Sequence, residues 1–226
     1  MIDFARQRLT MVDTQLRPNE VTNVRLLAAM SMLPRERFVP ERLRALAYID
    51  ETIEVYPETD GAPARFLLSP MVLARLIELA AVEPDDEVLD LGCATGYSAA
   101  ILSRLGRNVI GVEPEPELAR AARRTLRELN LANADIVEAP LRGGYPKKGP
   151  YDVILMNGSV PALPEALLAQ LREGGRLAAI LSPGGSGAMG RAYRFIKVGE
   201  EASGLPHFDG WAPPLPGFSP EPSFNF

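Results

Sequence analysis

From residue 87 onwards the chain alternates short apolar segments with helical segments, and this alternation limits the fold more than any other feature. Strand-like apolar runs begin at Glu87, Asn108, Ala134, Tyr151 and Arg176. Continuous apolar strands between helices are typical of a parallel sheet covered on both faces. Because βαβ crossovers are right-handed, the pattern predicts a doubly wound, mostly parallel α/β fold whose ligand binds at the carboxyl ends of the strands.

The N-terminal third has a different pattern. Residues 1–65 are expected to form a helical extension, because residues 23–33 carry apolar side chains at helical spacing. Residues 51–65, rich in proline, glycine and acids, are predicted to be a loop with one edge strand. A strong helix is expected next, with Ser69 as its N-cap and Pro70 at its first position.

The C-terminal end is rich in proline. Residues 66–203 are expected to form the ligand-binding domain, and residues 204–226 a tail in which regular structure gives out. His207 falls in this tail, where a packing or surface role is favoured over catalysis. Trp211 and Phe218 are expected to hold the tail against the domain.

Composition narrows the classes of function. The formal net charge of −5 gives no general attraction to phosphate backbones, so a nucleic acid partner is disfavoured. No apolar run approaches the ~20 residues of a membrane span, and the N-terminus is too polar for a secretory signal, which makes the cytoplasm the expected location. A single cysteine and a single histidine argue against a disulfide framework, a metal site and a Ser-His-Asp site.

The stretch EVLDLGCATGYSAAIL, residues 87–102, passes from a predicted strand into a helix through a turn with two glycines. Gly92 and Gly96 allow the backbone to turn sharply and a ligand to approach closely. A dinucleotide fingerprint would need glycines at positions 92, 94 and 97, but the chain has Ala94 and Tyr97 there. A pyrophosphate ligand is therefore disfavoured.

Two acidic residues near this turn favour S-adenosylmethionine instead. Asp90 precedes the turn and is expected to order it near the cofactor's amino group, whereas Glu113 follows the next strand and can accept hydrogen bonds from two ribose hydroxyls. Each has a structural alternative: Asp90 as a partner of the helix N-terminus, and Glu113 as a solvated strand end. Their placement after consecutive strands favours the cofactor.

The expected cofactor site gathers residues from several strand ends: Asp90, Leu91, Gly92, Ala94, Gly96, Tyr97, Glu113, Pro114, Ala139, Pro140 and Asn157. Cys93, within the turn, is expected to be a small buried side chain rather than a reactive thiol. Asn157 either lines the cofactor or substrate pocket or forms an Asn-Gly turn. Because Gly158 and Ser159 follow it, the Asn/Asp-Pro-Pro-aromatic motif of amino-directed nucleic acid methyltransferases is absent, and base methylation is disfavoured.

Several segments of the chain resemble protein-L-isoaspartate O-methyltransferases, over roughly residues 20–182. They are LPRERFVP (33–40), AYID (47–50), SPMVLARLIELA (69–80), VLDLGCATGY (88–97) and GPYDVILMNGSVPALPEALLAQLREGGRL (149–177). The glycine turn is shared by many methyltransferases, whereas the Arg-Glu-Arg-Phe-Val-Pro segment is much more specific.

The resemblance implies that S-adenosylmethionine is used to methylate the free α-carboxylate of isoaspartyl residues in damaged proteins. A carboxylate with a pKa near ~4 is already an anion at neutral pH, so this reaction needs no histidine base. Alignment of oxygen, methyl carbon and sulfur, with exclusion of water, can supply the catalysis.

The chain departs from this family at two sets of expected site residues, and also in the loop of residues 54–66, which is longer and more acidic than in the family. The family has a Thr-x-Ser-x-Pro segment whose serine lies near the substrate carboxylate, and ungapped alignment on Pro70 puts Phe66 and Leu68 at the threonine and serine. Ser69 takes the catalytic place only if a one-residue gap is allowed, and its role as a helix cap is favoured.

The second departure follows the third strand of the predicted sheet. The resemblance places Ala139, Pro140 and Leu141 at the family's Gly-Asp-Gly, whose aspartate accepts from the adenine amino group. Backbone groups can still bind the adenine edge, and Glu138 can replace this acid if the strand end is shifted. The alternative is a reduced affinity for the cofactor.

Three hypotheses follow from the sequence. The first is an S-adenosylmethionine-dependent carboxyl methyltransferase of the isoaspartyl type, with an altered active site. The second keeps the cofactor but methylates another substrate. The third is a catalytically silent relative that binds cofactor or protein without turnover.

Overall fold

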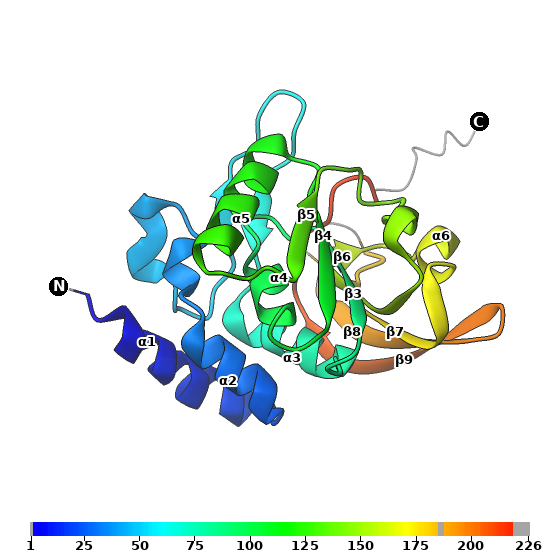
Figure 1. Cartoon of the computed structure of the whole chain (residues 1–226), viewed down its shortest axis with the longest axis horizontal. Coiled ribbons are helices and arrows are strands. Elements are labelled where there is room, and N and C mark those ends of the chain that lie inside the picture. Colours follow the sequence, from blue (N-terminus) through cyan, green and yellow to red (C-terminus); the bar gives the residue numbers. More distant parts are fainter. Residues whose placement is uncertain (1, 185–187, 219–226) are drawn as a thin grey trace.

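The computed structural model describes residues 2–184 and 188–218, and a seven-stranded sheet forms its centre (Figure 1). The strands lie in the order β5-β4-β3-β6-β7-β8-β9. Their bounds are β3 (Glu87–Leu91), β4 (Asn108–Val112), β5 (Ala134–Val137), β6 (Tyr151–Val160), β7 (Leu171–Leu181), β8 (Gly190–Val198) and β9 (Glu201–Gly210). The first five strands in this order are parallel, and β8 and β9 are antiparallel, so the predicted doubly wound, mostly parallel sheet is confirmed.

The two faces of the sheet are covered differently. The helices that pack with the larger of two buried clusters are α3 (Pro70–Ala80), α4 (Tyr97–Leu102) and α5 (Pro116–Glu128). The smaller cluster, on side chains such as Leu89 and Leu91 of β3, is closed by the short α6 (Glu165–Leu168) and by irregular segments that include Leu141 and Leu215. Helices therefore cover one face well, and loops complete the cover of the other.

The N-terminal extension packs beside α3 and α4. Its elements are α1 (Phe4–Met11), η1 (Val12–Leu16), η2 (Arg17–Asn19), α2 (Val24–Met32), η3 (Arg35–Arg37) and η4 (Glu41–Leu46). Asn23 caps α2 by accepting from the backbone N–H groups of Arg25 and Leu26. The predicted helical extension is present, although much of it is 3₁₀ or π-type helix.

The segment predicted as a loop with one edge strand contains two strands. β1 (Ile53–Tyr56) and β2 (Arg65–Leu67) pair in antiparallel fashion, and the connection between them stands away from the body of the molecule (Figure 1). The expected boundary between residues 65 and 66 thus falls inside β2. In β1, buried Ile53 and Val55 alternate with more exposed residues. The prolines and acids of the connection that follows made this strand pattern difficult to detect in the sequence.

Two expectations for the C-terminal third are wrong. The sequence pattern of residues 162–175, between two apolar strand-like runs, predicts a helix, but α6 has four residues and β7 begins at Leu171. Pairing overrides helix propensity here, because the Tyr151 N–H donates to Gln170 O at 2.8 Å and draws the chain into the sheet. The expected tail boundary at residue 204 falls inside β9, so His207 lies in a strand.

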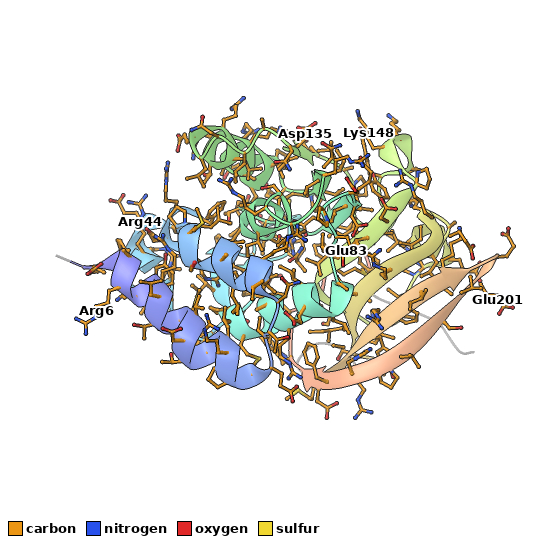
Figure 2. The ribbon with its side chains drawn as sticks, turned by 60° about the horizontal axis from the view of Figure 1, so that its bottom comes forward. Arg6, Arg44, Glu83, Asp135, Lys148 and Glu201 are labelled. Carbon is orange, nitrogen blue, oxygen red and sulfur yellow. The ribbon has the colours of Figure 1, made fainter. Side chains whose placement is uncertain are left out.

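The hairpin of β8 and β9 forms one end of the molecule. Figure 2 shows Glu201 at the tip of this hairpin, far from Arg6 and Arg44 on the N-terminal extension. Glu83, Asp135 and Lys148 mark the region between these ends in the same view. The short 3₁₀ helix η5 (Pro146–Lys148) precedes β6.

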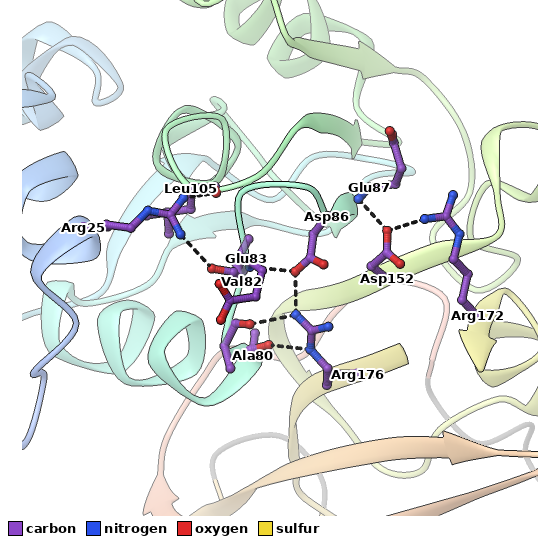
Figure 3. Close-up of polar contacts among 11 residues, drawn as sticks. Arg25, Ala80, Val82, Glu83, Asp86, Glu87, Leu105, Asp152, Arg172 and Arg176 are labelled. Carbon is purple, nitrogen blue, oxygen red and sulfur yellow. Dashed lines mark hydrogen bonds and ion pairs between the residues drawn. The ribbon is translucent and has the colours of Figure 1, made fainter. Parts of the chain in front are cut away.

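The amino ends of the strands are held by a polar network (Figure 3). Arg176 of β7 donates to Ala81 O at 2.7 Å and forms an ion pair with Asp86, whose Oδ2 also accepts from the Glu83 N–H at 2.7 Å. Asp152 accepts from the Glu87 N–H at 2.8 Å and pairs with Arg172. These contacts tie α3, β3, β6 and β7 together at the edge opposite the glycine turn.

Among the residues that the structure describes, no helix is long and apolar enough to cross a membrane.

Candidate functional site

The candidate site lies at the carboxyl ends of β3, β4 and β6, where the order of the strands reverses. Gly92 adopts φ +75° and Gly96 φ +92°, a region that residues with a Cβ rarely occupy. A Cβ at Gly96 would lie 3.0 Å from Ala122 Cβ, so glycine also allows α4 to approach α5. The turn therefore has the geometry expected from its glycines.

Asp90 is fully buried beneath this turn. Its carboxylate accepts from Ser98 Oγ at 2.7 Å and from Asn157 Nδ2, which links β3, α4 and β6. Burial raises the pKa of Asp90 to about 7, and the negative charge of Glu113 acts in the same direction, whereas the two hydrogen bonds oppose the shift. Asp90 thus joins the strand before the turn to the helix that follows it and to β6.

Glu113 is also fully buried, which excludes the alternative of a solvated strand end. Arg65 Nε donates to Glu113 Oε1 at 3.1 Å, and Arg65 Nη2 donates to Oε2 at 3.0 Å. The backbone N–H groups of Ala94 and Glu115 complete the set, at 2.8 Å to Oε2 and 3.2 Å to Oε1. Both carboxylate oxygens are therefore paired within the chain, a feature that sequence reasoning did not foresee.

The remaining predicted site residues surround these two carboxylates. Asn157 Nδ2 donates to Asp90 and to Leu91 O at 3.3 Å, and Asn157 lies within β6 rather than in an Asn-Gly turn. Tyr97 and Cys93 are buried, while Pro114 and Ala139 are half-buried and Pro140 is exposed. The structure gives no polar side chain at 139–141 in place of the acid that the family carries there.

The segments that carried the family resemblance meet at this turn. Thr95 Oγ1 donates to Phe38 O at 2.6 Å, and the rings of Phe38 and Tyr97 lie 5.3 Å apart. Arg35 is fully buried and donates to Ala47 O at 2.7 Å and to Leu68 O at 2.8 Å. Leu68 directly precedes SPM, and the Met71 N–H donates to Asp50 Oδ1 of AYID at 3.0 Å. The LPRERFVP, AYID and SPM segments therefore form one wall of the candidate site.

Ser69 is the N-cap of α3. Its Oγ accepts from the Val72 N–H at 3.4 Å, and the side chain is buried. Leu68, at the family's serine in the ungapped alignment, is buried as well and offers only its backbone carbonyl to Arg35. The structure thus confirms the predicted cap. Leucine at position 68 has no hydroxyl group that could hold a substrate carboxylate.

Sequence reasoning missed Arg65 and Leu215. Arg65 was assigned to the end of a loop, and its partner Glu113 is 48 positions away, so no local spacing pattern could join them. A cation directly before the apolar run FLL was the one available signal. Leu215 lay in the proline-rich tail, where it was not singled out.

The strand ends bring together the residue types that the sequence predicts for a ligand with a ribose and an ammonium group. Gly92 and Gly96 have no side chain to cover the backbone of the turn, and Asp90 and Glu113 supply two carboxylates at adjacent strand ends. The conformation nevertheless fills this place with the chain's own groups. A Cβ at Gly92 would meet Leu215 Cδ2 at 2.6 Å and Arg65 Nη2 at 3.1 Å.

A doubly wound sheet with a glycine turn and two carboxylates at its switch point defines the class as a Rossmann-like α/β protein whose ligand is expected at the carboxyl ends of the strands. The model of the family "Protein-L-isoaspartate(D-aspartate) O-methyltransferase (PCMT)" matches residues 7–197. The chain therefore belongs to the protein-L-isoaspartate(D-aspartate) O-methyltransferase family.

Curated relatives agree with this membership. The chain is 38% identical over 174 residues to the protein-L-isoaspartate O-methyltransferase of Koribacter versatilis, covering 77% of this chain and 76% of the relative. It is 32% identical over 217 residues to the protein of the same name from Rhodopseudomonas palustris, covering 91% and 96%. The similarity thus extends over nearly the whole length of that relative.

Solved structures support the fold. A protein-L-isoaspartate O-methyltransferase superposes with a TM-score of 0.79 at 24% identity, over 94% of this chain and 66% of the other. A putative protein-L-isoaspartate O-methyltransferase from Plasmodium falciparum, in complex with S-adenosyl-L-homocysteine, gives a TM-score of 0.72 at 20% identity, over 92% and 97%. At these identities the likeness concerns the fold.

Proposed function

We propose that this chain transfers the methyl group of S-adenosylmethionine to the free carboxylate of isoaspartyl residues in proteins. The observation that carries the proposal is the meeting of the LPRERFVP, AYID and SPM segments with the glycine turn, through Arg35, Phe38 and Thr95. This wall joins the most family-specific sequence to the strand ends at which a doubly wound fold binds its ligand. Membership in the family supports the same reaction.

The residues proposed to hold the cofactor are those of the turn and the adjoining strand ends. Gly92 and Gly96 would allow close approach of the backbone, Glu113 would accept from the ribose, and Asp90 with Asn157 would fix the turn from beneath. Leu91, Ala94, Tyr97, Pro114, Ala139 and Pro140 complete the proposed lining. When bound, the sulfonium of the cofactor supplies an activated methyl group.

The chain's own contribution to the chemistry is positioning and exclusion of water. An isoaspartyl carboxylate is ionised at neutral pH, so the site needs no general base to activate it. Arg35 fixes the Leu68 carbonyl from a fully buried position and thereby sets the wall against which a substrate would lie. Alignment of the reacting atoms can contribute several kcal/mol to the lowering of the barrier.

The decisive experiment measures transfer of a radiolabelled methyl group from S-adenosylmethionine to an isoaspartyl peptide. The same peptide with an ordinary aspartyl residue is the matched control, because it differs only in the position of the free carboxylate. We expect labelling of the isoaspartyl peptide alone, and at a low rate, because Leu68 cannot donate a hydrogen bond to the substrate. Equal labelling of both peptides, or of neither, would contradict the proposed substrate.

A second candidate is a protein that binds the cofactor without turnover. The observation that favours it is again Leu68, together with the lack of a polar side chain at 139–141. Binding of S-adenosylhomocysteine without methylation of any isoaspartyl peptide would select this candidate. The cytoplasmic location expected from the sequence is kept as part of the first proposal, and cell fractionation would test it.

A further inference from the structure

Residues 211–218, which we call the C-terminal strap, pack into the candidate site after the end of β9. Ala212, Leu215 and Phe218 are 3%, 3% and 4% exposed, so the strap is built into the core despite its prolines. Leu215 and Phe218 belong to the same buried cluster as Leu89 and Leu91 of β3. The strap therefore covers the face of the sheet that has the fewest helical residues.

The strap is attached to the end of β6 by backbone pairing. The Ser159 N–H donates to Pro213 O at 2.8 Å, and the Leu215 N–H donates to Ser159 O at 2.9 Å. Ser159 Oγ adds a third bond, to Ala212 O at 2.9 Å. A Cβ at Gly158 would lie 2.7 Å from both Pro213 O and Leu215 Cγ, so the glycine at this position makes room for the strap.

Leu215 and Arg65 cover the two groups that a nucleoside ligand would need, which are the backbone of Gly92 and the carboxylate of Glu113. Leu215 Cδ2 lies 2.6 Å from the place of a Cβ on Gly92, which leaves no space above the bare backbone of the turn. Arg65 binds both oxygens of Glu113, and its side chain in this ion pair is 4% exposed. A ligand that uses Gly92 and Glu113 must displace both residues.

We propose that the free chain is self-closed: the C-terminal strap, through Leu215, and the Arg65–Glu113 ion pair occupy the cofactor site and compete with S-adenosylmethionine. This inference rests on the proposed function. When only a fraction of the molecules is open, the apparent Kd equals the intrinsic Kd divided by that fraction. Closure therefore lowers the apparent affinity, and a change that weakens the strap raises it.

The first test compares binding of S-adenosylhomocysteine by calorimetry to the unmodified chain and to Leu215→Ala. Loss of the leucine side chain removes apolar packing from the closed state only, so the apparent Kd is expected to fall at least about threefold. Leu131→Ala is the matched control, because Leu131 is 4% exposed, close to the 3% of Leu215, but belongs to the other core cluster. Its affinity is expected to equal that of the unmodified chain.

The second test needs no variant, and so does not depend on the folding of Leu215→Ala. Trp211 is the chain's single tryptophan, is 39% exposed and lies at the start of the strap. If the ligand displaces the strap, S-adenosylhomocysteine should shift the tryptophan emission to longer wavelength and increase its quenching by acrylamide. Both changes should saturate with the Kd found by calorimetry.

The outcomes separate this inference from the proposed function. Binding with equal affinity by the unmodified chain and Leu215→Ala, with unchanged Trp211 emission, overturns self-closure and leaves the cofactor assignment standing. Absence of binding by the unmodified chain, Leu215→Ala and Leu131→Ala at millimolar ligand overturns both. Tighter binding by Leu215→Ala alone, with the emission change in the unmodified chain, supports self-closure.

Discussion

At the level of single residues, burial determines the charge of Asp90. Its pKa is about 7 in the folded chain, well above the ordinary value near ~4, because the carboxylate is removed from water. A carboxyl group whose pKa is raised on folding is more stable protonated, so its contribution to the free energy of unfolding declines as pH rises from about 4 to about 7. Above that pH the loss is constant.

Asp90→Asn is expected to remove this dependence. Asparagine has the same shape and can still bond to Ser98 and Asn157, but it carries no charge to desolvate. The free energy of unfolding at pH 8 should rise by ~2–4 kcal/mol relative to the unmodified chain, with little change at pH 4. Urea titrations at the two pH values measure this, and an equal effect at both would show that the charge is not responsible.

Ser69→Ala separates a helix cap from a catalytic hydroxyl. The bond from the Val72 N–H to Ser69 Oγ indicates a loss of ~1 kcal/mol in stability, with methyl transfer per folded molecule nearly unchanged. Denaturation and turnover should be measured on one sample. A fall in turnover of one to two orders of magnitude, ~1.4–2.8 kcal/mol in the barrier, would instead place the hydroxyl at the substrate carboxylate.

At the level of elements, the two ends of the parallel strands, which we call the amino and carboxyl edges of the sheet, have different roles. The amino edge holds the ion pairs of Asp86 with Arg176 and Asp152 with Arg172, and the carboxyl edge holds the candidate site. We therefore expect stability and ligand binding to respond separately to mutation.

Asp86→Ala should reduce the free energy of unfolding by ~2–3 kcal/mol, because it leaves Arg176 without its carboxylate in a largely buried place. The affinity for S-adenosylhomocysteine should not change. Asp209→Ala is the control, since its pair with Arg191 is exposed and should matter little. An altered ligand affinity in folded Asp86→Ala would show that the two edges are coupled.

The connection between β1 and β2 is the element expected to be cut first by proteases. Residues 57–64 are mostly exposed and contain one small turn, closed by reciprocal backbone bonds between Thr59 and Ala62. Mass spectrometry of a brief digestion should find the earliest cleavage there. Early cleavage between residues 87 and 115 would contradict the placement of the central strands.

At the level of the whole molecule, ligand binding and folding are linked. S-adenosylhomocysteine that binds the folded chain should stabilise it by ~2.7 kcal/mol at a hundredfold excess over the apparent Kd. Thermal denaturation with and without ligand measures this gain. Asp86→Ala should melt lower yet gain a similar amount, and no shift at millimolar ligand would rule out the cofactor.

Much of the architecture could be predicted from local pattern. Apolar runs between helical segments defined the five parallel strands, and the cap at Ser69 and the helix after Asn23 followed from residue type and spacing. The glycines of the turn predicted a sharp bend of the backbone, and Gly92 and Gly96 have positive φ angles in the structure. These features depend on residues that are close in sequence, so a single stretch contains the information.

The tertiary structure decided the features that depend on distant partners. Strand β7 begins at Leu171 because Leu171 pairs with Tyr151 of β6, before a register shift that leads to the pair of Arg176 with Val153. Strand β9 formed because β8 supplied a partner for residues 201–210. Arg65 met Glu113, and Leu215 met Gly92, across separations that no local spacing records. The sequence alone determined the fold class and the residue types at the strand ends. Only the packing of distant segments decided which of those groups are available to a ligand. A buried charge or an uncovered backbone needs a partner, and the fold determines which side chain lies beside it.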